Sequence, residues 1–197
     1  MQILHTDPDI VVCIKPVGMD AEHALPDALQ ETVGGAIFPV HRLDLNVGGV
    51  MVYARTKKAA AALSRAIQEG TMIKEYVAQV HGTPPEKGDW EDLLWKDARR
   101  NKVYPVKRMR GGVKRARLTY CRLHGGNPSL VRIRLYTGRS HQIRVQFASR
   151  GFPLLGDHKY GARDTLTAPR LFSCCITFSL HGKTLRFEAL PEWAEST

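Results

Sequence analysis

Three segments of the sequence bring together side chains that could take part in catalysis. The first, His41 to Thr56, places the carboxylate of Asp44 shortly before the pair Gly48-Gly49. The second holds Tyr76 in an alternating strand pattern, and the third, residues 137–162, is dense in arginine, histidine and other polar side chains. A carboxylate can act as a general base or as a nucleophile, and glycines let the backbone turn tightly or approach a ligand closely. The three segments are therefore candidate site loops.

Each segment also has a purely structural interpretation. Asp44 could cap a turn or bridge to Arg42, and Tyr76 could simply belong to the core of its strand. The arginines from Arg139 to Arg144 could lie at the solvated start of a helix. The residue types alone leave these alternatives open.

Hydrophobic periodicity predicts the elements that position these segments. Thr56 suits the N-cap of a helix with a 3.6-residue apolar period, and Gly70 suits the position just after its end. The apolar stripe consists of Ala59, Ala60, Leu63, Ala66 and Ile67. A second helix could begin with Ser140 as its cap and close at Gly151. Its apolar residues fit a strand equally well, so both forms stay open there.

Most of the remaining pattern is strand-like. Apolar or alternating runs bounded by turn residues occur at residues 10–14, 50–54, 73–81, 118–123, 130–136, 171–178 and 185–189. Because few helices are available as crossover connections, a largely antiparallel sheet is favoured. We therefore expect an α+β fold, and the length of 197 residues suits a single domain.

Composition narrows the classes of partner. The net charge is +10 and the pI about 9.7, so polyanions such as RNA, DNA or an anionic membrane are candidate partners. No apolar run approaches the roughly 20 residues of a membrane-spanning helix, and the N-terminus lacks the pattern of a signal peptide. We therefore expect a cytoplasmic protein that binds no membrane. The four cysteines include no C-x-x-C and are expected to be structural: Cys13, Cys121, Cys174 and Cys175.

Positive charge is concentrated between Lys96 and Arg117. Ten basic residues and a single acidic one lie there, which accounts for +9 of the net charge of +10. Tyr104 could stack on a base, and the excess of arginine over lysine suits phosphate oxygens. A solvated hairpin is the alternative. We expect RNA backbone contacts from Arg108, Arg110, Lys114 and Arg115.

Taken together and in order, these motifs resemble the signature blocks of the RluA-type pseudouridine synthases. Two blocks carry most of the resemblance: His41-Arg42-Leu43-Asp44 followed by Gly49, and Gly138 to Arg144 followed by Gly156-Asp157 and Tyr160-Gly161. Three weaker blocks are similar as well: Lys15-Pro16 with Gly18, Lys74 with Tyr76 and Gly82, and Pro169-Arg170-Leu171. The blocks follow the family's order over almost the whole chain.

The resemblance implies a mixed, mainly antiparallel central sheet with a few flanking helices. It also implies a single catalytic domain over residues 1–197, without the N-terminal accessory RNA-binding domain of many relatives. The implied activity is isomerisation of uridine to pseudouridine in structured RNA, in a ribosomal or transfer RNA stem-loop. No obligatory protein partner is implied.

The resemblance further assigns roles to single residues. Asp44 would be the catalytic carboxylate, Tyr76 would stack on the target base, and Arg139 would pair with Asp44. Arg42 would enter the RNA helix as the target base leaves. Further substrate contacts would come from His41, Gln142, Ile143, Arg144 and Leu171.

The implied chemistry accounts for these residue types. The N1 glycosidic bond breaks, and the freed uracil turns and is reattached through C5. The carboxylate could act as a base at the sugar or as a nucleophile, and the sequence leaves both open. An arginine would hold the carboxylate ionised, and an aromatic ring would retain the detached base after it has been flipped out of the helix. No redox step or hydrolysis occurs, so no metal or cofactor is expected.

The sequence departs from the family pattern in two places. Val47-Gly48 stands where relatives usually have Thr-Ser, and Ser173-Cys174-Cys175 where they have Leu-His-Ala. These departures support the alternative of a catalytically inactive RNA-binding protein, although Asp44, Tyr76 and Arg139 are all retained.

A metal-dependent hydrolase is a third reading of the sequence. It would recruit histidines such as His41, His141 and His158 as metal ligands. The eight histidines of the chain show no H-x-x-x-H spacing, which disfavours this reading.

Overall fold

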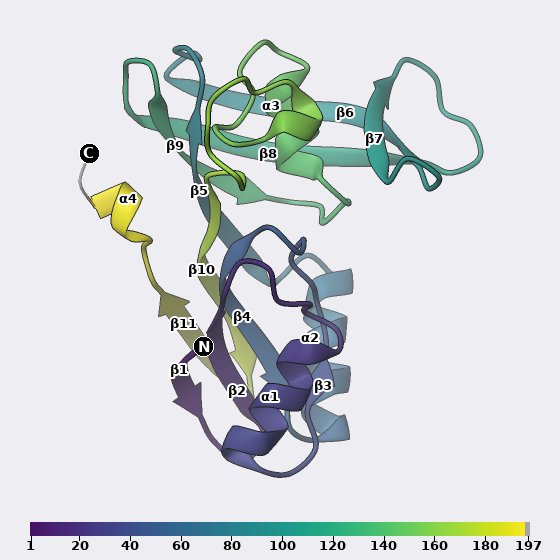
Figure 1. Ribbon diagram of the computed structural model, residues 1–197. Coiled ribbons are helices and arrows are strands. Elements are labelled where there is room, and N and C mark those ends of the chain that lie inside the picture. The colour runs from purple at the N-terminus through teal and green to yellow at the C-terminus, as the bar shows by residue number, and fades with distance from the viewer. Residues whose placement is uncertain (196–197) are drawn as a thin grey trace. The chain divides into compact units, whose positions relative to one another are not determined.

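The structure, a computed structural model, describes residues 1–195. The chain forms two compact units (Figure 1). The first contains residues 1–75 and 172–195, and the second contains residues 76–171. Residues 196 and 197, the last two of the domain predicted over 1–197, lie outside the described residues. The single domain stays a prediction.

The first unit is built on a sheet. Its strands are β1 (Gln2–Thr6), β2 (Ile10–Lys15), β3 (Phe38–Pro39), β4 (Gly48–Ala54), β10 (Leu171–Leu180) and β11 (Lys183–Glu188). The order is β1-β2-β4-β10, with β11 beside β10 and β3 beside β4. The β4–β10 pair is parallel, whereas β1–β2, β2–β4, β3–β4 and β10–β11 are antiparallel. The sheet is therefore mixed and mostly antiparallel, which confirms the predicted fold class.

The helices of the first unit are α1 (Ala24–Val33), α2 (Lys57–Gln68) and α4 (Glu192–Glu195). Helix α2 packs its predicted apolar stripe onto the sheet, because Ala59, Leu63 and Ala66 join a buried cluster with residues of β2, β4 and β10. The predicted N-cap is confirmed: Thr56 Oγ1 accepts a hydrogen bond from the Ala59 amide at 3.1 Å. Gly70 follows the helix with φ +71°, as the predicted stop requires.

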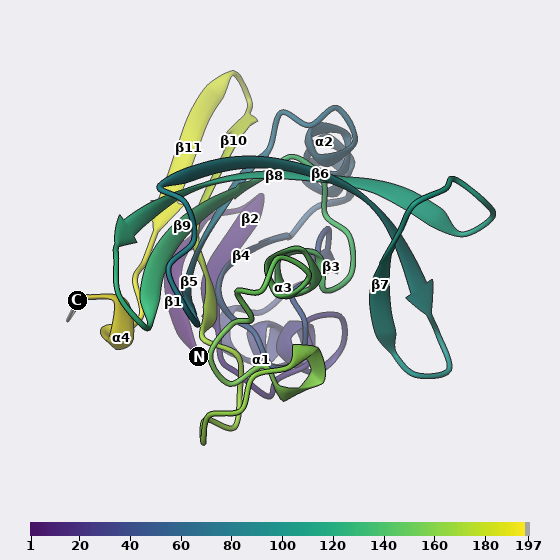
Figure 2. The same cartoon turned by 90° about the horizontal axis from the view of Figure 1, so that it is seen from above.

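The second unit contains most of β5 (Ile73–Val80), which it enters at Tyr76, together with four further strands. These are β6 (Lys87–Asp97), β7 (Lys102–Val106), β8 (Val113–His124) and β9 (Ser129–Leu135). Their order is β5-β9-β8-β6-β7. The long strands β6 and β8 arch over helix α3 (Gln142–Ala148), as Figure 2 shows. An aromatic cluster joins helix and sheet, since the Phe147 ring lies 4.7 Å from that of Trp90 and 5.2 Å from that of Tyr120.

The sequence left a helix and a strand open for the residues after Ser140, and the structure has a helix there, α3. The prediction that Ser140 caps it is wrong. The N-cap is His141, which has a left-handed backbone (φ +52°) and makes no side-chain cap. Its Nδ1 is instead within hydrogen-bond distance of the Tyr160 hydroxyl, at 2.8 Å. Gly151, with φ +86°, follows the helix as predicted, and its amide donates to the Ala148 carbonyl.

Candidate active site

The loop that carries Asp44 is tied down by a buried lysine. Lys15 is fully buried at the end of β2, and its Nζ donates to the carbonyls of Pro16 (2.9 Å), Met19 (2.8 Å) and Leu45 (3.2 Å). Burial lowers the pKa of Lys15 to about 8, an effect opposed by the negative charges of Asp20 and Asp44. The ammonium group therefore fixes the backbone directly after the predicted catalytic carboxylate.

The same loop is closed by two backbone hydrogen bonds. The Asp44 carbonyl accepts from the Val47 amide at 3.0 Å, and the Leu45 carbonyl accepts from the Gly18 amide at 2.9 Å. The Asp44 side chain is partly buried, so it lies at the surface of a well-anchored turn. Such anchoring reduces the freedom of a carboxylate that must act in one orientation.

The His41 side chain takes the place of a backbone carbonyl where the pairing of β3 with β4 ends. Strand β3 pairs Pro39 with Tyr53, and beyond it the Val52 amide donates to Nε2 of His41 at 3.2 Å. Burial, together with the nearby charge of Lys74, lowers the pKa of His41 to about 3. The imidazole is therefore neutral and carries its proton on Nδ1, a buried atom without a partner among the described residues. His41, predicted to bind substrate, has a structural contact here.

Arg42 has the exposure that its predicted role requires. The side chain is 62% exposed and donates to Glu22 at 2.6 Å. A surface ion pair of this kind contributes about 1 kcal/mol or less, so the guanidinium can leave it at little cost. Its predicted insertion into the RNA helix stays a prediction.

The departures from the family pattern lie in the interior of the first unit. Val47 and Ser173 are 2% exposed, and Ser173 Oγ donates to the Val50 carbonyl at 3.0 Å. Gly49 has φ +129°, and a Cβ there would overlap the backbone of Ser173 on the parallel neighbouring strand. Gly48 is also buried against that strand. These residues lie where β4 packs against β10. They therefore belong to the sheet that supports the Asp44 loop.

The cysteines are all free, as expected of structural thiols. Cys13, Cys174 and Cys175 are fully buried, and Cys121 is partly buried. Burial raises the pKa of Cys13 to about 12 and raises that of Cys175 as well. The thiols of Cys13 and Cys175 therefore stay protonated and unreactive at neutral pH.

In the second unit, Arg144 and Asp157 form a buried ion pair. Nε and one terminal nitrogen of Arg144 each donate to a carboxylate oxygen of Asp157 at 2.7 Å, and the side chains are 7% and 1% exposed. The guanidinium also lies 5.2 Å from the ring centre of Tyr160. Arg144 was predicted as a substrate contact. Asp157 orients it by a bidentate bond, a role that the motif alone does not indicate.

Gln142 organises the loop that presents Arg139. Its Oε1 accepts from the Thr137 hydroxyl (2.8 Å) and the Arg139 amide (3.0 Å), while its Nε2 donates to the Arg117 carbonyl (3.1 Å). The Arg139 side chain is exposed, and its Nε donates to the Arg115 carbonyl at 2.9 Å. Gln142 is 2% exposed, so its side chain stabilises the loop through buried hydrogen bonds. Its predicted contact with substrate stays a prediction.

The remaining predicted site residues lie on strands or in the core. Tyr76 on β5 and Leu171 at the start of β10 are each 6% exposed, and Ile143 is 4% exposed. Tyr76 and Arg139 belong to the second unit and Asp44 to the first. The role of Tyr76 as a stacking partner stays a prediction.

The basic segment contains the end of β6, the hairpin partner β7 on one side of β6, and the start of β8 on its other side. Arg115 donates to Glu91 at 2.8 Å, which neutralises part of its charge. Arg110 lies over the ring of Trp95 at 5.5 Å, and Arg108 and Lys114 are exposed. Arg108, Arg110 and Lys114, three of the four residues predicted to contact phosphates, thus present charge to solvent without a carboxylate partner among the described residues.

In residues 1–195 no group of His, Cys, Asp and Glu side chains could hold a metal ion. His158, one of the histidines that a metal site would recruit, lies between the carbonyls of Ala162 (3.1 Å) and Leu166 (2.7 Å). None of the described helices is long and apolar enough to cross a membrane.

Known proteins resemble this chain over most of its length. It is 32% identical over 203 residues to the dual-specificity RNA pseudouridine synthase RluA of Salmonella typhi, covering 94% of this chain and 91% of the relative. The RluA of Escherichia coli K12 is 32% identical over 207 residues, with 95% and 91% covered. An uncharacterized RNA pseudouridine synthase of Aquifex aeolicus is 34% identical, with 88% and 60% covered.

Solved structures share the fold. The human RNA pseudouridylate synthase domain containing 4 superposes with a TM-score of 0.82 at 24% identity, covering 98% of this chain and 89% of that one. The human RNA pseudouridylate synthase domain containing 1 gives 0.87 at 20% identity, with 99% and 85% covered. The family model described as RNA pseudouridylate synthase matches residues 9–149, a range that includes the Asp44 loop. This chain therefore belongs to the RNA pseudouridylate synthase family.

Proposed function

We propose that this chain isomerises uridine to pseudouridine in a structured RNA, with Asp44 as the catalytic carboxylate. The observation that carries the proposal is the position of Asp44 within the matched family range, on a loop anchored by the buried Lys15. The surrounding residues support an active enzyme. The two departures from the family pattern lie in buried strand packing and leave the loop's anchors in place.

The proposed steps follow from the groups present. The target base leaves the helix, Arg42 fills its place, and the ring of Tyr76 retains the uracil after the N1 bond breaks. Asp44 acts as base at the sugar or as nucleophile. An arginine, proposed to be Arg139, keeps the carboxylate ionised. Rejoining through C5 releases the C5 proton to solvent, and N1 takes up a proton from solvent in its place.

The substrate is proposed to be a stem-loop of ribosomal or transfer RNA. The net charge of +10 and the exposed cations of the second unit support an RNA partner. The RluA relatives are described as dual-specificity enzymes, which favours testing both classes of RNA. We further propose that residues 1–197 act as one catalytic domain in the cytoplasm, without a metal, cofactor or obligatory protein partner.

Two measurements test this function. Transcriptome-wide pseudouridine mapping with and without the gene should reveal at least one modification that depends on the protein. The purified protein should release tritium from RNA labelled at C5 of uridine, because the reaction replaces that hydrogen. A protein that binds RNA but neither restores the missing modification nor releases tritium would be the inactive RNA-binding alternative.

A further inference from the structure

We propose that a pocket in the second unit, bearing Lys96, Lys114 and Arg139, binds a backbone phosphate of the substrate RNA. The inference rests on the proposed function, which supplies the RNA. It adds Lys96, which lies outside every family block and outside the four residues predicted to contact phosphates. The pocket places Lys96 with Lys114, one of those four, and with Arg139, which belongs to a family block.

Strand register explains how the pocket forms. Successive side chains of a strand point to opposite faces, so Leu94 and Lys96 share one face of β6. Leu94 is paired with Lys114 on β8, and Lys96 is paired with Val103 on β7. Four side chains from three neighbouring strands thus lie together on that face.

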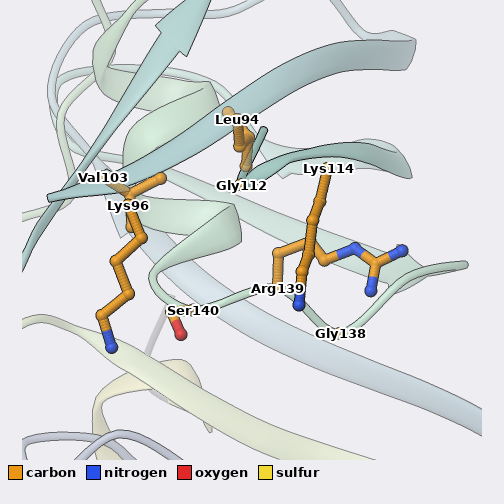
Figure 3. A pocket seen from close by; sticks show the side chains of 8 residues that line it. All are labelled: Leu94, Lys96, Val103, Gly112, Lys114, Gly138, Arg139 and Ser140. Atoms are coloured by element: carbon orange, nitrogen blue, oxygen red, sulfur yellow. The ribbon is translucent and has the colours of Figure 1, made fainter. Parts of the chain in front are cut away.

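The loop before α3 supplies the remaining wall. Gly138, Arg139 and Ser140 come from this loop and, with Gly112, complete the lining of a pocket of about 160 Å³ (Figure 3). The Arg139 amide and Nε hold this loop to Gln142 and to the Arg115 carbonyl. The wall is therefore anchored in place before any ligand arrives.

The charges of the pocket have no internal counter-ion. Its lining includes three cations and a hydroxyl but no acidic side chain. Lys96 and Lys114 make no ion pair with any described residue. On the opposite face of β8, by contrast, Arg115 is paired with Glu91 (2.8 Å) and Arg117 with Asp89 (2.7 Å). The sequence therefore neutralises one face of this strand and leaves the other positive.

The lining favours a phosphate over a base. Bases bound by proteins are held by stacking, and no aromatic ring lines this pocket. Phosphate oxygens accept hydrogen bonds from ammonium, guanidinium and hydroxyl groups, the polar groups present here. An anion would also relieve the mutual repulsion of the three cations.

The test compares two charge-matched double variants. Lys96→Gln/Lys114→Gln removes two charges from the pocket, and Arg117→Gln/Arg186→Gln removes two from ion pairs with Asp89 and Glu188. Binding of fluorescently labelled transfer RNA is measured across a potassium chloride titration, with thermal unfolding as the check on folding. The pocket variant should bind more weakly, and its slope of log affinity against log salt should flatten by roughly 0.7 to 0.9 for each phosphate that it no longer neutralises.

The control variant should keep the wild-type slope, because its arginines are already bonded to carboxylates. Equal slopes for the two double variants would overturn the phosphate pocket. Tritium release by the wild-type protein is measured in parallel. If the wild type is active while the pocket variant binds normally, the pocket is wrong and the function stands. If the wild type is inactive on all RNA while the pocket variant binds more weakly, the proposed reaction fails instead.

Discussion

At the scale of single residues, the chemistry is predicted to depend on the charge of Asp44. Asp44→Asn keeps the size of the side chain and some hydrogen bonding but removes the basicity that either mechanism needs. Pseudouridine formation should be abolished, while RNA affinity and the thermal unfolding midpoint should stay near those of the wild type. Single-turnover assays at saturating enzyme check this. A variant within about tenfold of the wild-type rate would remove Asp44 from the central role.

Arg139→Lys separates two possible contributions of this side chain. Lysine keeps the positive charge but loses the planar fork that can orient a carboxylate through paired hydrogen bonds. If Arg139 orients Asp44, the single-turnover rate should fall well before RNA affinity does. A variant with the wild-type rate would limit Arg139 to a charge in the phosphate pocket, where lysine can substitute.

His41 should make the stability of the fold depend on pH. Its pKa is lowered from 6.5 to about 3, so between these values the unfolded chain binds a proton that the folded chain does not. The free energy of unfolding should therefore fall as the pH drops from 6.5 toward 3. Urea titrations at several pH values measure this. His41→Gln should show a shallower decline over that window, whereas an identical decline would mean that His41 is protonated in the folded state.

At the scale of elements, helix α2 is the part that the sequence predicts best, since its apolar stripe, its N-cap residue and the glycine that follows it all indicate the same helix.

Thr56→Ala should destabilise the protein by about 1 kcal/mol, because the hydroxyl accepts from the Ala59 amide and also donates to Asp9 at 2.9 Å. Chemical denaturation measures the change. Thr32→Ala is the matched control. Its hydroxyl bonds back to the Ala28 carbonyl from an exposed position of α1, so stability should change little. Equal destabilisation of both variants would contradict the capping role.

Other elements could not be predicted from the sequence, for identifiable reasons. Helix α1 contains Pro26, which obscured its pattern although the proline lies in the first turn, where it is tolerated. Strands β6 and β7 are hard to predict because charged residues interrupt their apolar pattern: acidic residues do so in β6, and β7 lies inside the basic segment. The cap of α3 was misassigned because His141 takes a left-handed backbone conformation that is uncommon for a residue other than glycine.

At the scale of the whole molecule, the motifs identified the loops of the candidate site but not the supports behind them. The family block that contains Lys15 assigns it no role, yet it is a fully buried ammonium bonded to three carbonyls. Nothing in the spacing of the sequence indicates such convergence, because Leu45 is thirty residues away from Lys15. Asp157 likewise becomes the partner of Arg144 only in three dimensions. Sequence patterns therefore predict which residues can react, and the packing of the chain determines how they are held.

The distribution of charge over the chain predicts how affinity and specificity are divided. Replacing Arg108, Arg110, Lys114 and Arg115 with alanine should weaken RNA binding about equally for a cognate stem-loop and an unrelated one, because phosphate contacts carry little sequence information. Most of the decrease in affinity should come from the three residues without a carboxylate partner, since Arg115 is already bonded to Glu91. Restoring Arg115 alone in the quadruple variant should therefore recover little affinity.

Fluorescence anisotropy with both stem-loops over a salt titration measures each affinity. Normal binding by the quadruple variant would identify the segment as a solvated hairpin, and a decrease confined to the cognate stem-loop would give it a role in sequence recognition instead.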